Sequence, residues 1–170
     1  MPEFKSIGSE SLNENVFKII GSEGFLLTAG DKNRYNTMTA GCGGFGILWN
    51  KSVCTVYVRK SRYTFEFIER FDHFTLSFFS EKYKGVLEFC GNNSGRNVDK
   101  ISQSGLTPIF GEDGLVYYCE AKLVIKCRKI YFQDLEPENI KDKKVLKEFY
   151  PTGDYHRIYI GEIIQCLSHL

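Results

Sequence analysis

The sequence predicts a mainly β protein, a β-barrel with short helices at its periphery. Three observations favour this class. The chain is rich in aromatic residues, with 14 Phe and 10 Tyr among 170 residues, and such side chains are common in strands. Most apolar stretches are short and bounded by turn residues, as in strands. Finally, strands and helices do not alternate regularly, so a doubly wound parallel sheet is not expected.

Seven stretches are predicted to form strands. Short apolar runs between turn residues mark the first two, and alternation of β-branched and aromatic residues marks the next two. Asp113 followed by Gly114 is a turn signal that leads into the fifth. Residues 158, 160 and 162 of the last strand would share one face, and residues 159, 161 and 163 the other. The predicted strands are 25–29, 45–49, 54–58, 74–79, 115–118, 121–132 and 155–167.

Four helices are predicted between these strands, at 64–71, 80–90, 97–104 and 137–149. Thr64 is the expected N-cap of the first. The second carries apolar residues at i, i+3, i+4 and i+7, the stripe of a helix that lies on a sheet. Gly105 follows the third as a C′ residue. The fourth opens with Pro137 and carries four lysines, which are most simply its solvated face.

Length and charge limit the function classes. A chain of 170 residues is expected to form one domain, 1–170. Lys and Arg exceed Asp and Glu by one, so neither nucleic acid nor an anionic membrane is an expected partner. We find no signal peptide and no apolar run near the ~20 residues that cross a bilayer, and we expect a cytoplasmic protein. The six cysteines form no CxxC pair, so we expect free thiols and no metal site.

Two segments carry the donors that an anion requires. Residues 59–64 read RKSRYT between a predicted strand and a predicted helix, and residues 94–100 read SGRNVDK at another helix entry. Guanidinium groups, hydroxyls and helix N-termini all bind phosphate oxygens. A solvated basic turn is the alternative interpretation of the first segment. The candidate phosphate-binding groups are those of residues 59–64 in the first segment, and Arg96 and Lys100 in the second.

A polar turn precedes these segments and offers mixed donors and acceptors. Its residues are Asn36, Thr37, Met38, Thr39 and Ala40. Amide and hydroxyl groups suit the edge of a flat heterocycle, and a methionine can lie against an aromatic face. An ordinary polar loop is the alternative. Because a ring-binding turn and a phosphate-binding loop lie about one small-ligand length apart, we interpret 34–69 as a site for flavin mononucleotide (FMN).

Three further features have competing interpretations. Residues 41–46 match G-x-G-x-x-G, but strand, turn and strand follow where a dinucleotide fingerprint needs a helix. The glycines are better explained by a bulge or close backbone approach, with or without a ligand. His156 could donate to a flavin or act as an acid near it, or be structural. Cys42 could instead be a nucleophile with His156 as its base, which would make the protein a hydrolase.

Together these residues resemble the flavin reductase-like, FMN-binding split-barrel family, especially its flavoredoxin-like branch. The resemblance covers about residues 36–162. Its signposts are NTMTA (36–40), GILWNK (46–51), VRKSRYTFEFI (58–68), FTLSFF (74–79), SGRNVDK (94–100) and DYHRIYIGEI (154–163). Two departures stand out: we expect Trp where Cys42 stands, and a Pro-containing turn at residues 60–61.

The resemblance implies a six-stranded Greek-key split barrel that forms a homodimer, with FMN near the dimer interface. Residues 36–40 and the position of Cys42 would contact the isoalloxazine. Thr64, Arg59, Ser61 and Tyr63 would serve the ribityl chain and phosphate. Lys100 and Arg96 would reach the phosphate, and His156 would approach the ring.

The implied function is that of an FMN-binding oxidoreductase of the flavin reductase type. Electrons would pass from NADH or NADPH through FMN to free flavin or to a redox partner protein. The alternative is a flavoredoxin-like electron carrier without efficient NAD(P)H oxidation.

Overall fold

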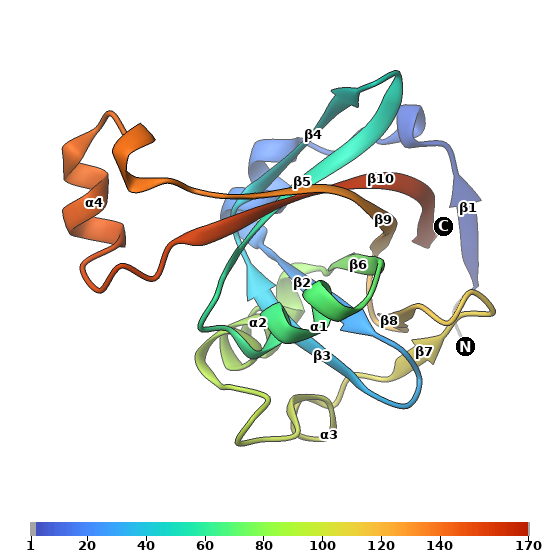
Figure 1. Ribbon diagram of the computed structural model, residues 1–170. Coiled ribbons are helices and arrows are strands. Elements are labelled where there is room, and N and C mark those ends of the chain that lie inside the picture. The colour runs from blue at the N-terminus through green and yellow to red at the C-terminus, as the bar shows by residue number, and fades with distance from the viewer. Residues whose placement is uncertain (1–2, 170) are drawn as a thin grey trace.

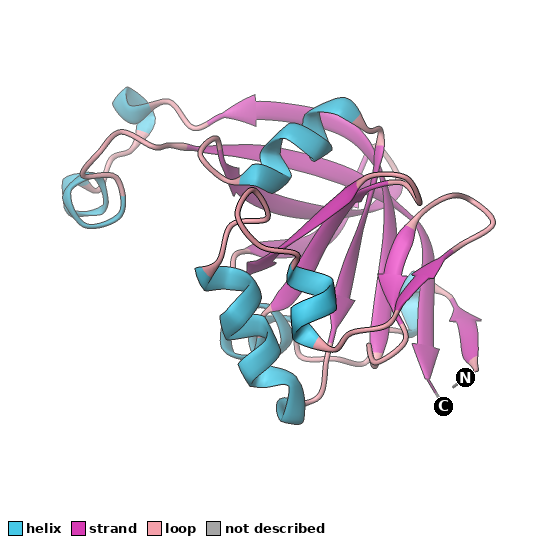
Figure 2. Ribbon diagram, turned by 90° about the horizontal axis from the view of Figure 1, so that it is seen from below, coloured by secondary structure: helices cyan, strands magenta, loops and turns pink. Residues whose placement is uncertain are grey.

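The computed structural model describes residues 3–169 and is built around a strongly curled antiparallel sheet (Figure 1). The main sheet contains β1 (Phe4–Ile7), β2 (Phe25–Gly30), β3 (Tyr35–Ala40), β4 (Gly43–Leu48), β5 (Lys51–Arg59), β6 (His73–Phe78), β9 (Leu123–Asp134) and β10 (His156–His169). A separate hairpin contains β7 (Pro108–Phe110) and β8 (Val116–Tyr118). The α-helices are α1 (Tyr63–Arg70), α2 (Lys84–Asn92), α3 (Lys100–Ser104) and α4 (Lys143–Phe149). Figure 2 shows the strands fanning around a common interior with the helices at the periphery.

The strand order shows why the sheet must curl. It runs β3-β2-β6-β9-β10-β5-β4, and β1 pairs with the end of β10. The two outermost strands of this path, β3 and β4, are consecutive in sequence and are joined only by Gly41 and Cys42. Two residues cannot span a flat seven-strand sheet, so the sheet must curl until its two edges, which do not pair with each other, lie near one another. The fold is therefore mainly β, as predicted, but the main sheet is open and has eight strands, so the expected six-strand count is wrong.

Side-chain alternation along the strands creates two cores. In β2, Phe25 and Leu27 face the interior of the curled sheet, whereas Leu26 faces outward. The interior core joins residues of β2, β5, β6, β9 and β10, and α1 adds Phe67 and Ile68 to it. The outer core lies between the sheet, α2 and the β7–β8 hairpin. As a result β2 is buried on both faces, which is why it reads as a continuous apolar run.

Several predicted elements are confirmed, and others are corrected. All seven predicted strands are present within a few residues, and Gly105 ends α3 in the left-handed region at φ 74°. Two short strands, β1 and β7, were not predicted, nor was the π-helical segment Phe17–Glu23. Predicted helix 137–149 is split into a 3-10 turn, Pro137–Asn139, and α4. Helix 80–90 likewise begins as a 3-10 turn, Glu81–Tyr83, before α2.

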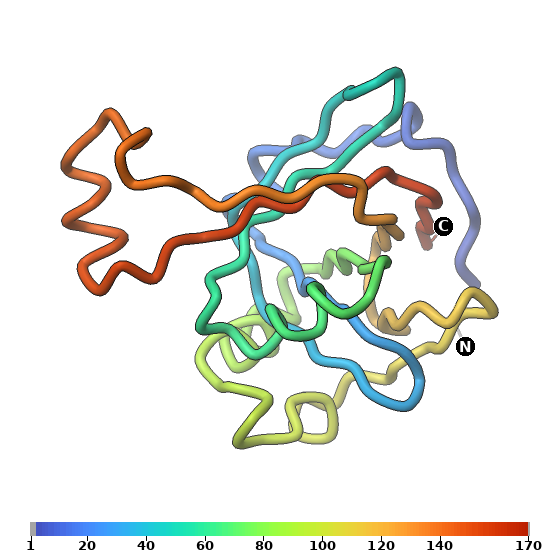
Figure 3. The backbone as a smooth tube through the Cα atoms, viewed as in Figure 1, coloured from blue at the N-terminus to red at the C-terminus, as the bar shows by residue number. Residues whose placement is uncertain are grey.

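The longest strands carry an arm that projects from the body of the molecule. β9 and β10 run side by side (Figure 3) and lead into residues 135–155, which include α4. The root of this arm is held by Arg157, whose guanidinium pairs with Asp134 at 2.6 Å and with Glu69 of α1 at 3.0 Å. The same guanidinium lies over the rings of Phe65 and Phe132. None of the helices in the described part of the chain is long and apolar enough to cross a membrane.

Candidate functional site

Two cavities lie next to each other where β3, α1 and the loop before α3 meet. The first, here called the α1 cavity, has a volume of about 350 Å³ and is lined by Met38, Arg59, Ser61, Arg62, Tyr63, Thr64, Asn93, Ser94 and Lys100. The second, here called the β3 cavity, has a volume of about 490 Å³ and is lined by residues 33–37, 63, 67 and 95–101. Lys100 and Tyr63 line both. The structure thus gathers most of the predicted phosphate ligands around one space.

Lys100 is the most unusual charged residue of this site. Its side chain is only 5% exposed, and its Nζ donates to the carbonyl oxygens of Thr37 at 2.8 Å and Cys90 at 2.7 Å. The ion pairs of residues 3–169 include none with Lys100. Burial, together with the nearby charge of Arg62, lowers the pKa of Lys100 to about 8. An ammonium group has three donors, so one remains for an anion that would also compensate the buried charge.

The first turn of α1 supplies further donors. The helix begins at Tyr63 after Arg62, and no side chain caps it. The predicted role of Thr64 as N-cap is therefore wrong: Thr64 lies inside the helix, is fully buried, and accepts a 2.7 Å hydrogen bond from Asn36 Nδ2. An uncapped helix start leaves backbone N–H groups free and carries a partial positive charge. Together with Lys100 and Arg62, it gives the α1 cavity the donor set of a phosphate site.

The expected polar turn, residues 36–40, is instead the edge strand β3. β-Branched threonines and the pairing with β2 explain the strand, since Thr37 lies opposite Thr28 in the ladder. Side chains alternate along it. Asn36, Met38 and Ala40 belong to the face of α1 and the interior core. Thr39 donates to the Leu87 carbonyl of α2 at 2.5 Å, and Thr37 donates to Leu27 O on β2 at 3.2 Å.

The strand geometry changes which groups of residues 36–40 can meet a ligand. Thr37 directs its carbonyl away from β2 to Lys100, so by strand alternation the backbone groups of Thr39 also lie on the free edge. Met38 is 5% exposed and lines the α1 cavity. Backbone donors of an edge strand, rather than the threonine hydroxyls, are therefore available to the polar rim of a flat ring.

Arg59 and Ser61 line the α1 cavity but are engaged by the arm. The guanidinium of Arg59 donates to the carbonyl oxygens of Asp154 at 2.8 Å and Phe149 at 2.9 Å, and it lies over the ring of Tyr150. Ser61 donates to the carboxylate of Asp154 through its Oγ at 2.5 Å and its backbone N–H at 3.3 Å. Sequence reasoning did not find Asp154 or Tyr150 because both belong to the arm, about 90 residues later in the chain.

Tyr63 lines both cavities, and Arg96 of the β3 cavity packs against its ring. The Arg96 guanidinium lies 4.8 Å from the centre of the Tyr63 ring, donates to the Ser61 carbonyl at 3.1 Å and pairs with Glu66. Arg34, which was not predicted, donates to the Tyr63 hydroxyl at 2.9 Å. Arg96 therefore holds the Tyr63 ring in place, and the carboxylate of Glu66 partly compensates the charge of Arg96.

His156 lies at the start of β10, opposite Arg59 in the β5 ladder. Its Nδ1 is 2.7 Å from the Tyr150 hydroxyl. Burial lowers the pKa of His156, and the charge of Arg59 lowers it further. Cys42 is exposed and contributes to the raised pKa of Tyr150, which is due first to burial. The structure therefore brings Tyr150 and His156 together beside Arg59.

His156 is expected to titrate below its ordinary pKa of 6.5. Its folded-state pKa is depressed, so it binds fewer protons in the folded than in the unfolded state. Its contribution to the free energy of unfolding is therefore complete above pH 6.5 and is lost as the pH falls through the folded pKa. An NMR titration of the imidazole Cε1–H resonance measures this value. A midpoint at or above 6.5 would contradict an assignment in which burial and the charges of Arg59 and Arg62 outweigh the carboxylate of Asp154.

Comparisons with known proteins agree with this architecture. An FMN-binding domain of a flavin reductase-like enzyme from Shewanella baltica OS155 superposes with a TM-score of 0.70 at 17% identity, covering 99% of this chain and 78% of that one. Flavoredoxin of Desulfovibrio vulgaris (Miyazaki F) gives 0.65 at 27% identity, covering 95% and 74%. The NADH:FAD oxidoreductase SgcE6 of Streptomyces globisporus C-1027 gives 0.63 at 16%, covering 86% and 75%. A search of curated proteins found no match.

The family model described as flavin reductase like domain matches residues 20–169. This segment contains all the predicted site residues and every strand of the main sheet except β1. The chain therefore belongs to the flavin reductase-like domain family, as the sequence motifs indicated.

Proposed function

We propose that this protein is an FMN-dependent oxidoreductase of the flavin reductase type. The observation that carries the proposal is the α1 cavity, which is lined both by the buried Lys100, unpaired with any carboxylate of residues 3–169, and by the uncapped start of α1. Such a donor set suits the phosphate of FMN. Bound FMN would supply the hydride and electron-transfer chemistry.

Different residues around the α1 cavity would bind different parts of FMN. Lys100, Arg62 and the first-turn N–H groups of α1 would hold the phosphate, and the Thr64 and Ser94 hydroxyls lie on the same lining. The free edge of β3 would meet the polar rim of the isoalloxazine, with Met38 against its face. Cys42 and His156 would lie toward the ring, where a neutral imidazole can donate a proton or a hydrogen bond.

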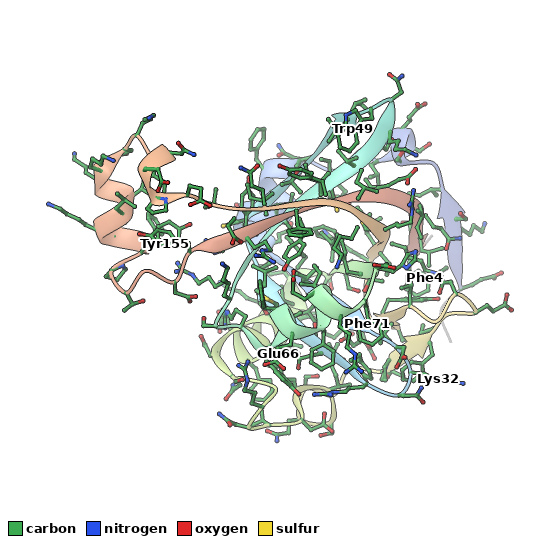
Figure 4. All side chains as sticks on the ribbon, viewed as in Figure 1. Phe4, Lys32, Trp49, Glu66, Phe71 and Tyr155 are labelled. Atoms are coloured by element: carbon green, nitrogen blue, oxygen red, sulfur yellow. The ribbon has the colours of Figure 1, made fainter. Side chains whose placement is uncertain are left out.

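The remaining parts of the proposal concern partners. NADH or NADPH would be the electron donor, and free flavin or a redox partner protein the acceptor. A homodimer is supported by large apolar side chains left on the surface, among them Ile47 and Trp49 near the tip of the β4–β5 hairpin, which are 73% and 63% exposed. Figure 4 labels Trp49 at this tip. Light scattering of the eluted protein would measure its mass, and a monomer at micromolar concentration would contradict this part.

A reconstitution experiment tests the proposed function. Purified protein mixed with FMN is expected to retain the ~450 nm flavin band after gel filtration. Anaerobic addition of NADH or NADPH should then bleach this band rapidly, since a reductase must accept hydride. Failure to retain FMN would contradict the cofactor assignment. Retention of FMN without bleaching would contradict the nicotinamide-dependent activity alone and would leave an electron carrier.

A further inference from the structure

The loop between β5 and α1 binds a carboxylate of the protein itself, the side chain of Asp154. The Asp154 carboxylate accepts from the Ser61 backbone N–H and from the Ser61 hydroxyl. This carboxylate is held by a backbone amide and a hydroxyl in a loop that follows Arg59 and contains Arg62. Such donors also hold phosphate oxygens. Both residues that donate to the arm, Ser61 and Arg59, line the α1 cavity.

The same contacts fasten the arm to the body. The Arg59 guanidinium donates hydrogen bonds to the carbonyl oxygens of Phe149 and Asp154 and stacks on the ring of Tyr150. Tyr150 is also bonded to His156. Tyr155, labelled in Figure 4, is the last residue of the arm before β10 begins at His156. The final segment of the arm, residues 149–155, is therefore hydrogen-bonded to residues that line the α1 cavity, where we place the cofactor phosphate.

We propose that Asp154 is an internal competitor of the cofactor phosphate, so that FMN binding releases the end of the arm. The inference rests on the proposed function. A phosphate that takes the Ser61 donors must displace the Asp154 carboxylate, because one N–H and one hydroxyl proton cannot serve two anions fully. Even a phosphate held only by Lys100 and α1 would be repelled by this nearby negative charge. Asp154 thereby sets the affinity of the site and links its occupancy to the Tyr150–His156 pair.

The test compares two ligands that differ only in the phosphate. FMN and riboflavin are titrated into wild-type protein and the Asp154→Ala variant, and dissociation constants are read from quenching of flavin fluorescence. Asp154→Ala is expected to bind FMN about tenfold more tightly, the scale of one hydrogen bond to a charged group, and riboflavin as the wild type does. Asp142→Ala is the matched control: it removes a carboxylate that caps α4 in the same arm, and it should leave both affinities unchanged.

Hydrogen exchange measures the arm directly. FMN is expected to increase deuterium uptake of residues 149–155 in the wild type, and riboflavin is not. If Asp154→Ala does not fold, Asp154→Asn removes the charge while keeping an acceptor for Ser61, and it should shift FMN affinity in the same direction. Unchanged or weaker FMN binding by the Asp154 variants, with wild-type binding intact, would overturn the competition alone. Absence of FMN binding by every protein would overturn the proposed function.

Discussion

Replacing Lys100 by Met is expected to weaken FMN binding by about 10- to 100-fold, the effect of losing a hydrogen bond to a charged group. Methionine has a similar length and keeps the apolar contacts of a side chain that is 5% exposed. It removes a buried cation of the α1 cavity that forms no ion pair within residues 3–169. Riboflavin affinity should change little, so the ratio of the two dissociation constants isolates the phosphate contribution.

A matched variant controls for the structural role of a buried lysine. Lys100 also ties β3 to α2 through the Thr37 and Cys90 carbonyl oxygens, and their loss would reduce stability by about 1–3 kcal/mol. Lys126 is equally buried but pairs with Asp113 at 2.7 Å, away from both cavities. Lys126→Met should therefore destabilise the protein without changing the FMN-to-riboflavin ratio. If Lys100→Met leaves this ratio unchanged, Lys100 does not bind the phosphate.

The pKa of Lys100 makes the same assignment testable by pH. Because this pKa is about 8, the ammonium form disappears above that value while the phosphate of FMN stays dianionic. FMN affinity should fall above pH 8 in the wild type but not in Lys100→Met. For the protein without FMN the sign is opposite: the depressed pKa contributes stability that is complete above the unfolded value of 10.5 and is lost as pH falls through about 8.

The sequence predicted the fold well where local pattern decides it. Each predicted strand became a strand because apolar alternation and a buried face agree, as in β2, where Leu26 and Leu27 enter different cores. The sequence-based prediction failed where the pairing of distant strands determines the structure. Residues 36–40 look like a polar turn, yet ladder bonds to β2 and an outer face on α2 make them a strand. Short β1 forms only because the end of β10 offers it an edge.

For the candidate site, the sequence identified the segments but not how their side chains are used. Lys100 was chosen for its place in a helix entry, and the structure shows a buried amine there. Arg59 and Ser61 were chosen for the same kind of reason, yet their donors face the arm. No local signal in residues 59–64 reveals a partner about 90 positions later. Arg62 belonged to the candidate segment 59–64 but was given no role of its own, although it immediately precedes the first helical residue.

Gly161→Ala is expected to destabilise the protein by about 1–3 kcal/mol or more, the cost of overpacking a dense interior. A Cβ at this position would lie 2.6 Å from Phe74 Cζ and 2.8 Å from Cys127 Cβ. Both neighbours are fully buried, so neither can swing into solvent. Gly161 also pairs with Cys54 across the sheet, and the sulfurs of Cys54 and Cys127 approach to 3.2 Å. The curled sheet is narrow here, and a methyl group has no space to enter.

Urea unfolding followed by circular dichroism measures this effect, with Gly46→Ala as the matched control. Gly46 lies in β4, and a Cβ there would meet no atom within 4 Å. Its replacement should change the free energy of unfolding by about 0.5 kcal/mol or less. A strand glycine costs conformational entropy in both places, so only the steric conflict distinguishes the two variants. Equal midpoints for Gly161→Ala and Gly46→Ala would mean that the interior expands to accept the methyl group, and the narrow, curled sheet that positions β5 and β10 beside the site would be refuted.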